Sequence, residues 1–175
     1  MTDRLQAAYS VFMKYGFRKT SMDDIAQEIG ISRQALYNQY GSKQELFDAV
    51  VVHMSTLSRT EAQKALAQPD KPIQERLIEA MDCRIGNHID DLRTSPHSHE
   101  IILAFEAGQS GKAVKEHSLN LIREAFIRDG LTPPNGSLED FLSTLKHVIE
   151  GLVHTVASRE EFLQELKKAI RVLLG

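Results

Sequence analysis

Apolar residues recur three or four positions apart along most of the chain, and this spacing predicts helices throughout. The stretch 20–43, TSMDDIAQEIGISRQALYNQYGSK, shows the pattern most clearly. Ser21 with Asp24 three residues later predicts a capping box, and Gly30 predicts the end of that helix because glycine tolerates a left-handed backbone. Ser32 predicts the cap of a second helix. The stretch therefore predicts two short helices joined by a tight turn, a helix-turn-helix.

The second of these helices, from Ser32 to about Gln39, has two different faces. Leu36 and Tyr40 lie four positions apart and are expected to face inward. The side chains left on the outer face are polar or aromatic: Arg33, Gln34, Tyr37 and Asn38. Arginine suits guanine edges, glutamine suits adenine, and hydroxyl groups suit phosphates. This face therefore favours DNA binding over an ordinary solvated helix surface.

Outside this stretch the pattern predicts helices only, with no strand alternation and no internal repeat. Their expected ranges are 3–15, 43–67, 73–92, 97–107, 112–128, 137–157 and 159–174. Together with the helix-turn-helix they make an all-α fold of about nine helices. We expect a small helix-turn-helix domain over 1–45 and a larger helical domain over 46–175.

The composition fits a folded protein in a reducing compartment. The 175 residues are 42% hydrophobic, enough for one or two domains with a real core. Cys83 is the single cysteine, which excludes an internal disulfide and favours a cytoplasmic location. No apolar run reaches membrane-spanning length, and residues 1–15 do not resemble a signal peptide, so we expect no membrane partner.

Charge constrains how the small domain could bind DNA. The chain has a formal net charge of −3, and residues 1–50 contain six Lys or Arg against six Asp or Glu. The positive side chains must therefore gather on one face, away from Asp23, Asp24 and Glu28. The available positive residues are Arg4, Arg18, Lys19, Arg33 and Lys43.

Residues 7–51 resemble the tetracycline-repressor (TetR) family of bacterial transcription regulators. Three segments carry the resemblance: AAYSVFMKYGF, KTSMDDIAQEIGIS and ALYNQYGSKQELFDAV. The resemblance implies an all-α fold in which the helix 32–39 recognises DNA. One departure is Gln34-Ala35, where many family members carry Gly or Pro followed by Thr, and it affects the expected base preference rather than the fold.

The resemblance also implies roles for single residues. In the family, the helix starts that correspond to Ser21 and Ser32 approach phosphates, and the residues matched by Tyr37 and Lys43 contact the DNA backbone. The positions expected to contact bases are Arg33, Gln34 and Gln39.

The last two helices have broad apolar faces, which suit either the chain's own core or pairing with a second copy. In the TetR family the corresponding helices pair with those of a partner subunit, so the resemblance implies a homodimer. Gly151 would let another helix approach closely. The expected interface residues are Phe141, Leu145, Gly151, Leu152, Phe162, Leu166, Ile170 and Leu173.

The middle helices contain apolar residues that could line a cavity for a small, largely hydrophobic effector or could equally fill the core. These residues are Met81, Ile85, Phe105, Leu121, Ala125 and Phe126. In the family's layout, the larger domain would bind the effector and form the dimer.

Two histidine-containing segments are alternatives to consider as metal sites. His97 and His99 are close in sequence to Glu100, but positions two apart point to different sides of a helix. The second segment is one helix face with no cysteine or second acidic residue: His147, Glu150, Gly151 and His154. We therefore expect no metal and no cofactor.

The hypothesis that follows is a dimeric DNA-binding transcription regulator, a repressor that an effector releases from a near-palindromic operator. A regulator controlled by a protein partner, without a small-molecule effector, is an alternative that the sequence leaves open. A helical enzyme would need a nucleophile with its base or a metal cluster, and the sequence has no such motif. We therefore expect no enzymatic activity, and the expected partners are double-stranded DNA, an effector and a second copy of the chain.

Overall fold

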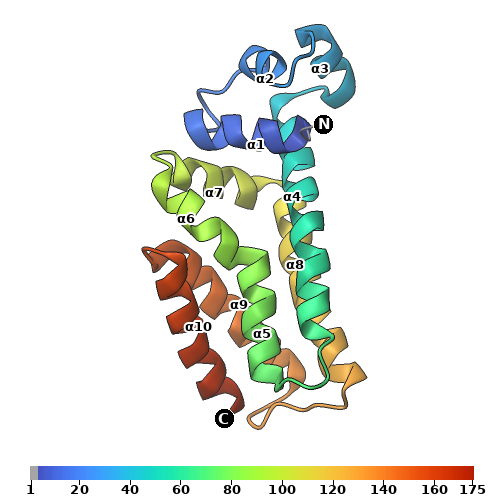
Figure 1. The fold of residues 1–175 in the computed structure, drawn as a ribbon, viewed down its shortest axis with the longest axis vertical. Coiled ribbons are helices and arrows are strands. Elements are labelled where there is room, and N and C mark those ends of the chain that lie inside the picture. Colours follow the sequence, from blue (N-terminus) through green and yellow to red (C-terminus); the bar gives the residue numbers. More distant parts are fainter. Residues whose placement is uncertain (1–3) are drawn as a thin grey trace. The chain divides into compact units, whose positions relative to one another are not determined.

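The fold is all-α, as predicted (Figure 1). A computed structural model describes residues 4–175, and this part of the chain contains no strand. Its helices are α1 (Arg4–Tyr15), α2 (Met22–Glu28), α3 (Arg33–Tyr40), α4 (Lys43–Leu66), α5 (Ile73–Met81), a π-helical segment (Asp82–Gly86), α6 (Asn87–Thr94), α7 (Ser98–Ala107), α8 (Gln109–Arg128), α9 (Leu138–Thr155) and α10 (Arg159–Leu174). Because α5, the π-helical segment and α6 follow one another without a break, they form a single helical run. The described residues therefore make nine such runs.

The caps predicted from serine and acidic residues are present. At the start of α2 the Asp24 N–H donates to Ser21 Oγ at 3.2 Å, and the Ser21 N–H donates to Asp24 Oδ2 at 2.9 Å. The same reciprocal pair, formed by Ser137 and Asp140, opens α9. Each pair satisfies two backbone N–H groups that the helix itself leaves without a partner. Local sequence therefore decides where these helices begin.

The chain divides into two compact units, each with its own core. The first unit contains residues up to 56 together with 91–114, and the second contains 57–90 together with 115–175. The helices α4, α6 and α8 each continue from one unit into the other. The division predicted between residues 45 and 46 is one of function, with the helix-turn-helix before it and the larger helical domain after it. This functional division stays a prediction.

The first unit packs α1 to α4 with α7. Figure 1 shows α1 between α2 and α7. Three aromatic rings lie at the centre, with Phe47 5.1 Å from Phe12 and 5.2 Å from Phe17 between ring centroids. Leu36 from α3 and Ile101 from α7 join the same apolar cluster. The helix-turn-helix is therefore held on a core that also includes α7.

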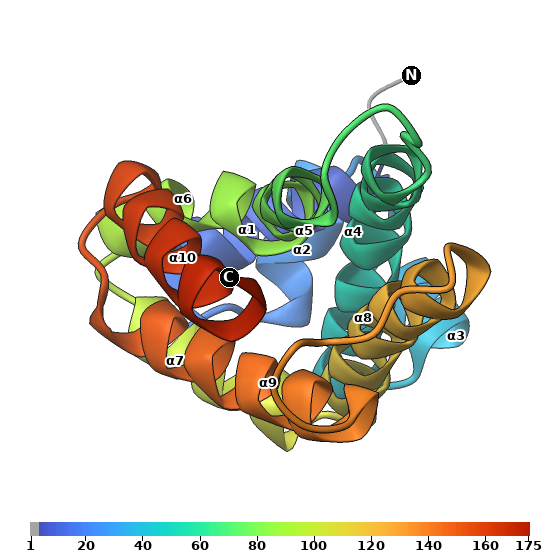
Figure 2. The ribbon, with the colours of Figure 1, turned by 90° about the horizontal axis from the view of Figure 1, so that it is seen from below.

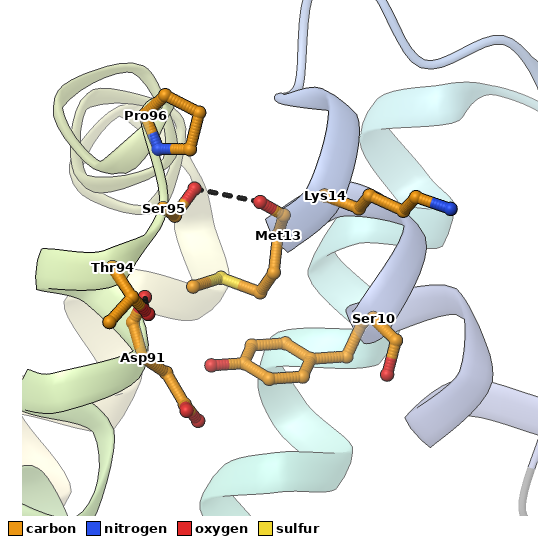
Figure 3. A pocket seen from close by; sticks show the side chains of 8 residues that line it. Ser10, Met13, Lys14, Asp91, Thr94, Ser95 and Pro96 are labelled. Atoms are coloured by element: carbon orange, nitrogen blue, oxygen red, sulfur yellow. Dashed lines mark hydrogen bonds between the residues drawn. The ribbon is translucent and has the colours of Figure 1, made fainter.

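The segment that opens α7 holds the loop between α1 and α2. Ser95 Oγ donates to the Met13 carbonyl at 2.7 Å, close to the end of α1 (Figure 3). The Glu100 carboxylate accepts from the Arg18 N–H in the loop itself. Residues more than 80 positions apart are thus joined within one unit.

Gly16 and Thr20 fix the shape of that loop. Gly16 has φ +80°, and a Cβ built there would lie 2.8 Å from His97 Cγ. The Thr20 hydroxyl is buried and donates to the Gly16 carbonyl at 2.6 Å. Any side chain at position 16 would strain the backbone and displace His97. His97 therefore packs against the loop instead of extending into solvent.

The second unit has its core among α5, α8, α9 and α10. Figure 2 shows α9 and α10 as neighbouring helices, and both contribute to this core. Phe126 and Phe141 pack with ring centroids 5.2 Å apart. A bidentate ion pair adds a polar link, in which Arg159 at the start of α10 donates to both carboxylate oxygens of Asp82 at 2.8 and 2.6 Å. This pair attaches α10 to the π-helical segment.

The predicted dimer interface needs correction at five positions. The residues in question are at most 2% exposed and lie in the core of their own chain: Phe141, Leu145, Phe162, Leu166 and Ile170. They have no surface left for a partner, because the apolar faces of α9 and α10 are used against each other and against α5 and α8. Gly151 is exposed, and Leu152 and Leu173 are partly buried. For these three residues an interface role stays a prediction.

Candidate DNA-binding site

The helix α3 presents nearly all of its side chains to solvent. Among its residues Leu36 alone is buried, with no exposed surface, and Tyr40 is partly buried against the core of the first unit. Ser32 Oγ caps the helix by accepting from the Ala35 N–H at 3.1 Å. The predicted inward pair and the predicted cap are therefore confirmed. The helix is short and polar, and its position depends on Leu36 and on the turn before it.

Arg33, the first residue of α3, is paired within the chain. Its Nη1 donates to Asp23 Oδ2 at 2.9 Å, and its guanidinium lies 5.3 Å from the centre of the Tyr37 ring. Both side chains of the ion pair are more than half exposed, so the pair contributes only about 0–1 kcal/mol. The expectation that Asp23 lies away from the positive face is wrong. A phosphate or a guanine edge would have to replace this carboxylate.

The glutamines of α3 also have partners within the helix. Gln34 Nε2 donates to Asn38 Oδ1 at 2.9 Å, one turn further on. Gln39 Nε2 donates to the Tyr40 hydroxyl at 3.1 Å. All these contacts are at the surface, where water competes with them, so exchanging them for base edges costs little. They hold the amides in place along the exposed face.

Lys43 is anchored more firmly than a surface lysine. Its Nζ donates to the Arg18 carbonyl at 3.1 Å and to the Thr20 carbonyl at 2.9 Å. The same ammonium lies 4.8 Å from the centre of the Phe17 ring. An ammonium has three N–H donors, so two are used on the loop between α1 and α2 and one is left over. Lys43 therefore ties the start of α4 to that loop in addition to any role at DNA.

Ser21 has a structural role in the absence of DNA. Its hydroxyl donates to Asp24 Oδ2 at 2.6 Å while accepting from the Asp24 N–H. The hydrogen bond from the Ser21 hydroxyl is the main reason that the pKa of the Asp24 carboxyl lies below its usual value, and the Ser21 N–H adds to it. Because Ser21 is exposed at the start of α2, its hydroxyl can still donate to a phosphate if the O–H turns away from Asp24 Oδ2.

The seven predicted DNA-binding residues thus come from three neighbouring places in one unit. Ser21 caps α2, Lys43 opens α4, and the others belong to α3 or its cap: Ser32, Arg33, Gln34, Tyr37 and Gln39. Sequence reasoning missed the Arg33–Asp23 pair and the two carbonyls that hold Lys43. No sequence signal could have found these contacts, because they join residues 10, 23 and 25 positions apart through the packing of separate helices.

The comparisons with known proteins agree with this geometry. Residues 5–50 match the family model of bacterial regulatory proteins of the tetR family. The segment that holds the helix-turn-helix is therefore of the TetR-family type. Its sequence is 30% identical over 115 residues to the HTH-type transcriptional regulator YezE of Bacillus subtilis strain 168. That match covers 58% of each chain, so this chain spans about three fifths of the length of that relative.

Solved TetR-family structures share the fold along nearly the whole chain. The repressor SmeT of the Stenotrophomonas maltophilia multidrug efflux pump SmeDEF superposes with a TM-score of 0.70 at 14% identity, covering 98% of this chain and 89% of SmeT. The regulator CifR, solved with a 26-bp operator DNA, gives a TM-score of 0.67 at 21% identity, covering 97% and 94%. At these identities the similarity establishes the TetR fold.

The residues expected to line an effector pocket are divided between the two cores of this chain. Phe105 packs against the cluster of the first unit. The other five belong to or pack against the cluster of the second unit: Met81, Ile85, Leu121, Ala125 and Phe126. All of these five except Ile85 are at most 6% exposed and are packed as core. Their role at an effector stays a prediction.

A shallow pocket of about 430 Å³ lies in the first unit (Figure 3). It is bounded by α1 and by the end of α6 with the residues that follow: Tyr9, Ser10, Met13, Lys14, Asp91, Thr94, Ser95 and Pro96. Burial, and secondarily the negative charge of Asp91, raise the pKa of Tyr9 to about 12. Tyr9 therefore stays neutral at physiological pH and acts as a hydrogen-bonding group.

The other candidate sites were the two histidine segments. Within residues 4–175 no three histidine, cysteine or acidic side chains come together as metal ligands. Burial is the main reason that the pKa of the Cys83 thiol is raised, and the thiol packs against the core of the second unit. Among the described helices, none is long and apolar enough to cross a membrane. The cytoplasmic location expected from the single cysteine stays a prediction.

Proposed function

We propose that this chain is a DNA-binding transcription regulator that uses α3 as its recognition helix. The observation that carries the proposal is the exposed face of α3, which groups the side chains that suit base edges. Leu36, on the opposite face, is buried and anchors the helix to the core. Arg33, Gln34 and Gln39 are expected to read bases. The residues expected to hold phosphates are Ser21, Ser32, Tyr37 and Lys43. The match of residues 5–50 to the tetR family model supports this assignment.

The proposed regulator acts as a homodimer. Two recognition helices can then occupy successive major grooves, about 34 Å apart, on a near-palindromic operator. The exposed parts of α9 and α10 are the surface proposed for pairing, with Gly151, Leu152 and Leu173 at the contact. Gly151 is the best-supported of these, because a Cβ built there meets nothing within 4 Å beyond the neighbouring backbone of its own helix. A partner helix could therefore approach the backbone at this point.

The proposed mode of regulation is repression that a small effector relieves. SmeT, which shares the fold, is named as a repressor, and this supports the sign of the effect. The helices α6 and α8 begin or end in the second unit and continue into 91–114, which belongs to the first unit. Within the first unit, Ser95 and Glu100 of that segment bond to α1 and to the loop after it. A shift of α6 or α8 on effector binding would therefore move the helix-turn-helix.

Selection of DNA from a random pool by the purified protein tests the proposal. The expected product is a near-palindromic site with half-sites about one helical turn apart. Arg33→Ala should relax the preference at one or two base positions. Arg171→Ala, which removes an exposed arginine from α10, is the matched control and should leave the selected sequence unchanged. A wild-type protein that enriches no sequence at all would contradict the proposal.

A further inference from the structure

Side chains on the exposed face of α3 form two pairs, each joined across one turn of the helix. In one pair the Arg33 guanidinium lies 5.3 Å from the centre of the Tyr37 ring. In the other, Gln34 Nε2 donates to Asn38 Oδ1 at 2.9 Å. Both amide side chains are exposed, so the second pair is part of the surface proposed to meet DNA. The roles proposed for α3 use Gln34 and leave Asn38 unassigned.

The hydrogen bond from Gln34 to Asn38 sets the orientation of the Gln34 amide. An amide group has an oxygen that accepts and a nitrogen with two N–H donors, and rotation about its last bond exchanges their places. Because Asn38 Oδ1 accepts from Nε2, the nitrogen of Gln34 is held on the side of Asn38. The bond uses one N–H and leaves Oε1 and the second N–H to bind another group. Gln34 therefore offers one acceptor and one donor next to each other in a fixed order.

Adenine is the base that matches such an edge. In the major groove it presents the N6 amino donor beside the N7 acceptor, and a glutamine amide binds both at once. Guanine presents two acceptors there, and cytosine presents a donor. A freely rotating amide can offer a single hydrogen bond to any of these bases, whereas an amide held in one order favours adenine. The effect of Asn38 is therefore on the choice of base more than on affinity.

We propose that Asn38 is a positioning residue, which holds the Gln34 amide for bidentate recognition of one adenine in each half-site of the operator. This role rests on the proposed function, because α3 must lie in the major groove for Gln34 to reach a base edge. Asn38 acts through Gln34 and needs no contact with DNA of its own. Positions four apart on a helix stay neighbours, so the pair can keep its hydrogen bond when α3 meets DNA.

Gln39 provides a contrast within the same helix. Its Nε2 donates to the Tyr40 hydroxyl at 3.1 Å, and Tyr40 is partly buried against the core of the first unit. The Gln39 amide is thus bonded to a side chain that packs against the core. The partner of the Gln34 amide is instead exposed on the proposed DNA-binding face. The fixed contact with adenine is therefore assigned to Gln34 rather than to Gln39.

A purely structural role for the bond between Gln34 and Asn38 predicts a different result. Hydrogen bonds between amides four positions apart stabilise helices weakly, so loss of such a bond would loosen α3 and weaken binding to every sequence alike. A positioning role predicts a change at one base pair. The readout that separates the two roles is therefore the base preference at a single position.

Selection of DNA from a random pool by the full-length wild-type protein and by Gln34→Glu locates the base pair. The wild-type protein is expected to enrich adenine at one position of each half-site. In Gln34→Glu a second acceptor replaces the amide donor, so the preference at that position should change to cytosine, whose N4 amino group donates to carboxylates. A wild-type preference for another base at that position, or a Gln34→Glu variant that changes no position, would overturn the proposal.

Two operators then measure the effect of Asn38. One is the selected site, and the other carries guanine in place of that adenine in both half-sites. The wild-type protein should prefer the first by roughly 5- to 150-fold per half-site, which corresponds to one bidentate contact. Asn38→Ala should reduce this ratio by roughly 2- to 10-fold per half-site, because the Gln34 side chain must then be ordered on binding. Fluorescence anisotropy at one salt concentration gives the ratio for each variant.

Two further variants serve as rescue and control. Asn38→Asp keeps an oxygen that accepts from Gln34 Nε2, so it should restore the wild-type ratio even though its added negative charge weakens binding to both operators. Asn135→Ala removes an exposed asparagine from the loop before α9 and should keep the wild-type ratio. An unchanged ratio in Asn38→Ala, or an equally reduced ratio in Asn38→Asp, would overturn the positioning role.

The positioning role of Asn38 and the proposed function can fail separately. An operator that the wild-type protein selects, with a ratio that Asn38→Ala does not change, removes the positioning role and leaves the DNA-binding regulator. A wild-type protein that enriches no sequence contradicts the proposed function and overturns the positioning role with it.

Discussion

Arg33 and Asp23 form an ion pair of 2.9 Å that joins the start of α3, the proposed recognition helix, to the first turn of α2. The pair places a negative charge beside the arginine that is expected to contact a guanine. In the free protein it shields Arg33, and on DNA it must open. The pair is highly exposed and contributes little to stability, so its effect is on binding.

Replacing Asp23 by asparagine should therefore raise the affinity for DNA of any sequence. The variant removes a repulsion with phosphates and leaves Arg33 available, so the dependence of log K on log salt should steepen by up to about one unit per subunit. Unfolding free energy should fall by less than about 1 kcal/mol, from the lost charge at the N-terminus of α2. Fluorescence anisotropy with random-sequence DNA at two salt concentrations measures the change. Glu28→Gln removes the same charge from α2, and an equal gain in both variants would show that Arg33 is not involved.

Substitutions at Arg33 and Lys43 should have different effects when DNA affinity and unfolding free energy are both measured. Arg33→Ala should lose about 1–3 kcal/mol per half-site for the specific operator, while its unfolding free energy stays within about 0.5 kcal/mol. Lys43→Met should weaken binding to all sequences alike and should also destabilise the protein by roughly 1–3 kcal/mol. The reason is that two hydrogen bonds to the Arg18 and Thr20 carbonyls are lost. Urea unfolding gives the second quantity, and an undiminished stability in Lys43→Met would contradict the anchoring role.

A substitution at Gly151 tests whether the exposed face of α9 is a dimer surface or an ordinary solvated helix face. A Cβ at this position meets nothing within 4 Å beyond the neighbouring backbone of its own helix, so Gly151→Glu should leave the fold of one chain intact. If a partner helix packs there, the same change should produce monomers in sedimentation at micromolar concentration. Ala113→Glu, at an exposed position on α8, is the control and should stay dimeric. A wild-type protein that is monomeric under these conditions would remove the homodimer from the proposal.

Leu166 illustrates why the choice of residue matters for that experiment. Its side chain has no exposed surface, so Leu166→Glu would bury a charge in the core and unfold the chain whether or not a dimer exists. Leu166→Ala is expected to lower the unfolding free energy by about 2–5 kcal/mol. Loss of stability there reports on the core of one chain and carries no information about the partner.

Asp129 should make the second unit sensitive to acid. Hydrogen bonds from Arg128 and then from Arg76 lower the pKa of its carboxyl from 3.8 to about 2. Because the folded pKa lies below the unfolded one, the stabilisation is complete above pH 4 and is lost as the pH falls toward 2. Between pH 7 and pH 3 the wild-type protein should lose on the order of 1 kcal/mol more than Asp129→Asn. Urea unfolding at pH 7, 4 and 3 measures the difference, and parallel curves for the two proteins would refute the assignment.

Much of this structure follows from local sequence. The pairs Ser21 with Asp24 and Ser137 with Asp140 set helix starts, because a serine oxygen and a carboxylate satisfy N–H groups within four residues. The spacing of Leu36 and Tyr40 is enough to orient α3, since helical periodicity alone separates its faces. The all-α fold and the exposed polar face of α3 were therefore predictable from residues close together in the chain.

Tertiary structure decided which apolar and charged groups meet. Periodicity shows that α9 and α10 have wide apolar faces. Only the packing shows that Phe162 and Leu166 are buried in the chain's own core. The sequence likewise counts charges without placing them. Asp23 reaches Arg33, and Asp129 reaches Arg76, because the packing of separate helices brings these side chains together. Burial and charge pairing depend on distances through space, which no local pattern of residues contains.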